Sequence, residues 1–125
     1  METQKIYTLA EKLLELPQTI QECQLSLMKI TEKILTLNEE ISVLESKIKS
    51  EITLEVDENN KKVYPNSESR DAAFVEKSSN SETLSGKRRY CNELQGISSL
   101  QRFEIERLQN EQRNIRSVLD FFKSI

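Results

Sequence analysis

An apolar residue recurs at alternating steps of three and four along the first half of the chain, without interruption. The positions are Ile6, Leu9, Leu13, Leu16, Ile20, Cys23, Leu27, Ile30, Ile34, Leu37, Ile41, Leu44 and Ile48. This spacing is that of the seam of a coiled coil, and it predicts a long helix over residues 3–56. Pro17 lies inside this segment. Because proline has no N–H and its ring clashes with the preceding turn, we expect a kink near it.

A second pattern of the same period follows in the last third of the chain, but polar residues interrupt it. Its positions are Leu84, Lys87, Cys91, Leu94, Ser98, Gln101, Ile105, Leu108, Gln112, Ile115, Leu119 and Phe122. It predicts a helix over residues 81–123. Gln101 and Gln112 either fix the register of the seam or lie where the seam reaches solvent.

Further apolar residues flank this second seam, so the helix either shifts its phase or has a broader apolar face. They are Ile97, Leu100, Phe103, Val118 and Phe121.

We expect the segment between the two predicted helices, residues 57–80, to connect them and to form a tip at one end of the molecule. Apolar residues alternate at Ile52, Leu54 and Val56 before a polar, turn-like run. This pattern fits a small β-hairpin over residues 52–64, and it fits equally a helix end followed by a loop. Pro65 and the polar residues after it are typical of a helix start, and they predict a short helix over residues 67–77.

The long apolar stripe of the first helix needs a cover, because each large side chain left in water forgoes roughly 1.5–3 kcal/mol. The second long helix is of similar length and can fold back along it. We therefore predict a single all-α domain, residues 1–125, that forms an antiparallel coiled-coil hairpin. Two helices bury little of each other, so we also expect a homodimer or higher oligomer in a multi-helix bundle. The predicted seam contains Ile20, Leu27, Ile30, Ile34, Leu37, Ile41, Leu44, Ile48, Leu94, Ile105, Leu108, Ile115, Leu119 and Phe122.

Composition argues against several classes of function. The net charge of −3 lacks the basic excess that is usual in nucleic-acid-binding domains. The absence of histidine removes the commonest general base and zinc ligand. No phosphate-binding loop or nucleophile motif is present, so we expect no enzyme activity, no cofactor and no metal. No apolar stretch approaches the ~20 residues that span a bilayer, and no secretory signal is evident, so we expect a cytoplasmic protein without membrane contact.

The one basic cluster holds Lys87, Arg88, Arg89 and Tyr90. These residues could contact nucleic acid, with the aromatic ring stacking on a base, or the cations could pair with the acidic first helix. Cys91 follows the cluster directly. Its thiol is either made reactive by the nearby cations or is a small apolar residue of the seam. In a cytosolic protein both cysteines are expected to be free.

Two resemblances add to these interpretations. The stretch 56–66, VDENNKKVYPN, followed by Arg70-Asp71-Ala72-Ala73, resembles the middle of small helical-hairpin proteins of phages and mobile elements. That resemblance implies a small accessory protein that acts on nucleic-acid metabolism or on host defence machinery. It would act by binding and not by catalysis. The order of long helix, short middle and second long helix is similar to a prefoldin subunit, which implies a chaperone clamp.

The favoured function is a non-enzymatic protein–protein interaction module, an accessory, inhibitor or adaptor protein that binds a partner through its tip or its helix faces. The sequence does not identify this partner. Loops presented by a rigid scaffold commonly carry specificity. The candidate contact residues of the tip are Asp57, Glu58, Asn59, Asn60, Lys61, Lys62 and Tyr64. The alternatives are a nucleic-acid-associated accessory protein that uses Lys87, Arg88 and Arg89, and a prefoldin-like chaperone clamp.

Overall fold

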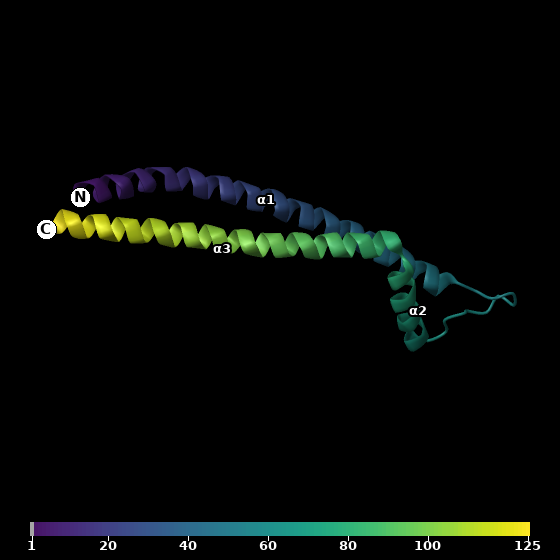
Figure 1. The fold of residues 1–125 in the computed structure, drawn as a ribbon. Coiled ribbons are helices and arrows are strands. Elements are labelled where there is room, and N and C mark those ends of the chain that lie inside the picture. The colour runs from purple at the N-terminus through teal and green to yellow at the C-terminus, as the bar shows by residue number, and fades with distance from the viewer. Residues whose placement is uncertain (1) are drawn as a thin grey trace. The chain divides into compact units, whose positions relative to one another are not determined.

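Three helices make up almost all of the chain in the computed structural model, which describes residues 2–125 (Figure 1). They are α1 (Glu2–Leu54), α2 (Ser67–Asn80) and α3 (Glu82–Ser124). The prediction of an all-α helical hairpin is confirmed: within residues 2–125 the only β pairing is a single bridge. The chain divides into two compact units, Met1–Thr31 with Gly96–Ile125, and Glu32–Gln95.

The first unit pairs the N-terminal part of α1 with the C-terminal part of α3, which run antiparallel side by side (Figure 1). Its core consists of Leu16, Ile20, Ile105, Leu108 and Ile115, with Leu9, Leu13, Cys23, Leu27 and Leu119 packed around it. All ten occupy the three-and-four pattern seen in the sequence. The hydrophobic effect therefore pairs the two helices along this stripe.

Polar contacts also join the two helices of the first unit. An ion pair links Lys12 to Glu111. The amide of Gln101 donates a hydrogen bond to the Ser26 hydroxyl at 3.0 Å, while its buried carbonyl oxygen has no partner among the described residues. Gln101 thus connects α3 to α1 at the cost of one buried unsatisfied acceptor.

The second unit packs α2 against the end of α1 and the beginning of α3. Leu84 and Ile52 are its most buried side chains, at 0% and 2% exposed. Ala73 of α2 is buried as well. Leu37, Cys91 and Leu94 of the long helices are also buried in this unit.

Caps at both ends define α2. The Asn66 side chain accepts a hydrogen bond from the Ser69 backbone N–H at 2.8 Å, and the Ser69 hydroxyl accepts one from the Asn66 N–H at 3.3 Å. This reciprocal capping box satisfies two helix-start donors. At the other end the N–H of Ser81 donates to the carbonyls of Lys77 and Ser78, so α2 continues to Asn80 and not only to residue 77 as predicted.

Ser81 alone separates α2 from α3. Its hydroxyl accepts a hydrogen bond from the Leu84 N–H at 3.2 Å, which caps the first turn of α3. One residue therefore ends one helix and begins the next.

The helix boundaries of α1 depart from the predicted range of 3–56. The helix ends at Leu54, because Val56 leaves it to form an antiparallel bridge with Lys62. It also continues through Pro17 without interruption. Since Pro17 has no N–H, the helix lacks one backbone hydrogen bond at this turn.

Burial of the predicted seam is uneven. The buried members are Ile20, Leu37, Leu94, Ile105, Leu108 and Ile115. The half-buried members are Leu27, Ile30, Ile34, Ile41, Leu44, Ile48 and Leu119. Phe122 is exposed, with its ring edge-on to that of Phe121, so this position lies outside the contact between the helices.

Candidate interaction surfaces

The tip between α1 and α2 is a tight turn that its own hydrogen bonds hold in place. The Asp57 carboxylate accepts from the backbone N–H groups of Asn59 and Lys61, each at 2.9 Å. The Asn60 N–H donates to the Asp57 carbonyl at 3.0 Å, and Asn60 itself has the left-handed φ of 61°. Asparagine tolerates this conformation better than most residues. Asp57 and Asn60 therefore order the turn. The described residues have the helix end followed by a loop, with the single bridge of Val56 to Lys62 in place of a β-hairpin.

The predicted contact residues of the tip have different structural roles. Asp57 and Asn60 shape the turn. Tyr64 is half-buried: the Lys77 ammonium lies 5.6 Å from the centre of its ring, and its carbonyl accepts from Arg70 at 3.4 Å. The side chains that the tip presents to solvent are those of Glu58, Asn59, Lys61 and Lys62.

An ion pair ties the base of the tip to α2. The Lys77 ammonium donates to the Glu55 carboxylate at 3.2 Å. This hydrogen bond raises the pKa of Lys77 above its usual 10.5, so the ammonium stays charged through the physiological range. Lys77 thus contacts both Glu55 and Tyr64 and connects the two sides of the tip.

A small groove lies beside the tip in the second unit. It has a volume of about 210 Å³, and its lining residues are Lys49, Ile52, Thr53, Arg70, Asp71 and Phe74. The Lys49 ammonium lies 5.0 Å from the centre of the Phe74 ring. This cation–π contact occupies part of the groove and joins α1 to α2.

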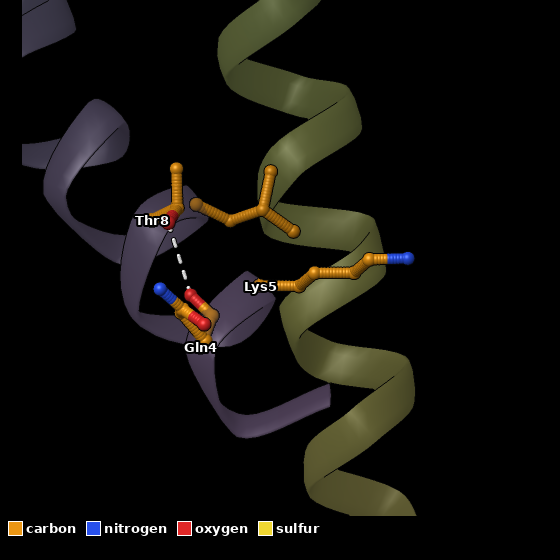
Figure 2. Close-up of a pocket in the computed structure, with 4 residues that line it drawn as sticks. Gln4, Lys5 and Thr8 are labelled. Atoms are coloured by element: carbon orange, nitrogen blue, oxygen red, sulfur yellow. Dashed lines mark hydrogen bonds between the residues drawn. The ribbon is translucent and has the colours of Figure 1, made fainter. Parts of the chain in front are cut away.

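A shallower hollow of about 450 Å³ lies at the start of α1, lined by Gln4, Lys5, Thr8 and Leu9 (Figure 2). The Thr8 hydroxyl donates to the backbone carbonyl of Gln4 at 2.9 Å and is thereby used within the helix. The Lys5 side chain extends away from this pair (Figure 2). The labelled polar side chains therefore point in different directions and do not converge on one point of the hollow (Figure 2).

The predicted nucleic-acid contact residues fall into two pairs. Lys87 forms an ion pair with Glu40 at 2.6 Å, and Arg88 forms one with Glu45 at 3.2 Å. Both cations therefore bind carboxylates of α1. Arg89 and Tyr90 are exposed on the outside of α3. The basic cluster thus serves in part to join two helices of the second unit.

Cys91 is buried at 4% exposure. Its thiol donates to the Asn38 side-chain oxygen at 3.4 Å and accepts from the Gln95 amide at 3.8 Å. Burial and these contacts favour the interpretation of a small packing residue over a reactive thiol. Cys23 is half-buried, and both cysteines are free.

Two features are absent from residues 2–125. No group of three or more potential metal-ligating side chains comes together in this part of the chain. None of its helices combines the length and the apolar character that crossing a bilayer requires. Comparison with protein-family models, with curated proteins and with solved structures finds no match to the chain.

The sequence did not indicate the pairing of particular charges across the helices. Lys12 with Glu111, Lys87 with Glu40 and Arg88 with Glu45 each join residues far apart in the chain. Only the general excess of acid in the first helix pointed to such pairs. The turn-forming role of Asp57 could have been found, because aspartate commonly binds the backbone N–H two residues later.

Proposed function

We propose that this chain is a non-enzymatic protein–protein interaction module, an accessory, inhibitor or adaptor protein that binds its partner through the tip. One observation carries the proposal. The tip is ordered by contacts of Asp57 and Asn60, and this order leaves Glu58, Asn59, Lys61 and Lys62 directed to solvent. A preordered loop loses little conformational entropy on binding, which favours recognition.

The exposed charged side chains of the tip favour a partner surface of complementary charge. Lys61 and Lys62 are exposed and adjacent, while Asp57 uses its carboxylate for the turn. Glu58 and Asn59 add one acidic and one hydrogen-bonding group. Such exposed charges set specificity and association rate more than affinity, so we expect binding that weakens with salt.

The nucleic-acid alternative has weaker support from the contacts. A phosphate backbone would compete with Glu40 and Glu45 for Lys87 and Arg88. Only Arg89 and Tyr90 of the cluster are free of such pairs and exposed. A chaperone clamp would instead bind unfolded clients through exposed apolar side chains at the helix ends, such as Phe121 and Phe122, and not through the polar tip.

The test is capture of partners from cell extract with the whole chain, compared with two charge-reversal variants. Lys61→Glu with Lys62→Glu changes the tip, and Lys29→Glu with Lys33→Glu makes the same change at exposed positions of α1. We expect one dominant partner on the unaltered chain and on the α1 variant, and its loss on the tip variant. Equal capture by the tip variant would contradict the proposal.

Two further measurements separate the alternatives. Binding of a single-stranded oligonucleotide, lost on Arg89→Glu and falling steeply with salt, would favour the nucleic-acid function instead. Arg89 is the cleaner probe because its replacement leaves the ion pairs of Lys87 and Arg88 intact. Suppression of aggregation of unrelated unfolded proteins would favour the chaperone clamp.

A further inference from the structure

Next to its contact with α1 in the first unit, α3 has a second heptad pattern, whose members each lie one residue before a seam position. We call it the outer strip: Ile97, Leu100, Glu104, Arg107, Glu111, Asn114, Val118 and Phe121. The steps between them alternate three and four, the spacing of a coiled-coil seam. All except the half-buried Glu111 are exposed, with Leu100 at 69% and Phe121 at 63%. Glu111 also forms the ion pair with Lys12 of α1, so the outer strip borders the contact between the two helices.

The order of residues along the outer strip is self-complementary. Two apolar residues stand at each end, and charged or polar residues fill the middle. In an antiparallel pair of strips, the first residue of one meets the last of the other, and so on inward. The layers are Ile97 with Phe121, Leu100 with Val118, Glu104 with Asn114, and Arg107 with Glu111. Apolar meets apolar and cation meets anion, and each layer occurs twice about a two-fold axis near Gln109.

A parallel pair of outer strips would bring like charges together. Each strip residue would then face its own copy, so that Arg107 would meet Arg107 and Glu104 would meet Glu104. Juxtaposed like charges oppose such a pairing. The charge pattern therefore selects the antiparallel arrangement, in which a closed, isologous dimer forms.

Arg107 has N–H donors that its contacts within one chain do not use. It contacts Glu104 at 2.6 Å and Glu111 at 3.6 Å, and its side chain is 61% exposed. A guanidinium has five N–H donors, more than these contacts use. It can therefore bind Glu111 of a second copy while it keeps Glu104.

We propose that the outer strip of α3 is the interface of an antiparallel homodimer of this chain. Its occupant is a second copy, because the strip complements itself layer by layer in both apolar character and charge. The proposal does not depend on the tip, which lies in the second unit. A homodimer presents two tips for binding, whatever their partner is.

The first experiment measures mass in solution by sedimentation equilibrium. We expect the unaltered chain to dimerise at micromolar concentrations, and Leu100→Lys with Phe121→Lys to weaken dimerisation by about 100-fold or more, because both apolar ends then carry charge. The matched control is Leu14→Lys with Leu25→Lys, at exposed apolar positions of α1. It should leave the dimer intact.

Circular dichroism of each variant checks that helix content is unchanged. A monomeric unaltered chain at about 100 µM, well above the expected dissociation constant, would overturn the proposal. A dimer that persists in the outer-strip variant, or that dissociates in the α1 control alone, would overturn it too.

The second experiment tests orientation by cysteine cross-linking. Leu100→Cys and Val118→Cys chains are mixed and oxidised, with the unaltered chain as background because it has two cysteines of its own. We expect a cross-linked dimer from the mixture and none above background from either chain alone, since two copies of residue 100 would lie ~27 Å apart along the axis. Cross-linking of Leu100→Cys by itself would show a parallel pair and contradict the proposal.

Discussion

At the scale of single residues, polar groups inside the seam set the balance between stability and register. Gln101 connects α3 to Ser26 of α1, but its carbonyl oxygen is buried without a partner. Leaving such an acceptor unsatisfied costs about 1–3 kcal/mol, while the hydrogen bond that the amide makes returns roughly 0.5–1.5. The residue therefore contributes more to the alignment of the helices than to their stability.

Gln101→Leu should accordingly stabilise the chain by about 1 kcal/mol, measured as the free energy of unfolding in urea. The leucine fills similar space and removes the orphaned oxygen. Gln21→Leu is the control, since Gln21 is exposed on α1 and the same change there should alter stability by less than about 0.5 kcal/mol. Destabilisation by Gln101→Leu would mean that the bond to Ser26 outweighs the buried acceptor.

At the scale of elements, the second unit depends on the junction of α2 with α3. Leu84 follows this junction directly and is fully buried. Ser81 caps the turn that holds it. Burial of Leu84 and Ile52 therefore fixes α2 against the long helices more than any ion pair does, because exposed ion pairs contribute little.

Leu84→Ala should destabilise the chain by about 3 kcal/mol, because it opens a cavity at a site with no solvent access. Leu54→Ala makes the same change at a position that is 75% exposed and should cost less than about 0.5 kcal/mol. Thermal unfolding followed by circular dichroism compares the two. Similar losses would show that burial at Leu84 is not what stabilises this unit.

The elements also show what the sequence could and could not predict. An apolar period sustained over residues 6–48 specifies a helix, and its narrow width specifies a partner helix. The end of α1 was placed two residues late, because the bridge of Val56 with Lys62 depends on the turn shaped by Asp57. The end of α2 was placed three residues early, because backbone hydrogen bonds from Ser81 extend a serine-rich turn that reads as a stop.

The candidate surfaces were less predictable than the helices. A run of polar residues indicates a tip, but not that Asp57 and Asn60 order it while Lys61 and Lys62 extend outward. Flanking apolar residues such as Leu100 and Phe121 were visible in the sequence. The sequence does not predict that these residues are exposed, because a second apolar stripe can also mark a shift of the seam.

At the scale of the whole molecule, the fold depends on the contact in which α3 covers the apolar stripe of α1 within the same chain. In the first unit this cover brings Leu16 and Ile20 against Ile105 and Leu108. Lys12 and Glu111 then meet across the two helices. Dimerisation through the outer strip adds a second contact beside this one, and Glu111 takes part in both.

The direct test is spin labelling at Lys12→Cys and Glu111→Cys in one chain, with Cys23 and Cys91 replaced by serine. Because these two positions face each other, we expect strong dipolar broadening of the electron paramagnetic resonance spectrum. Dilution with an excess of unlabelled chain removes the coupling between labels at position 111 of two copies, and strong broadening from the pair within one chain should persist at full dilution. Loss of the broadening on dilution would show that another copy, and not its own α3, covers α1.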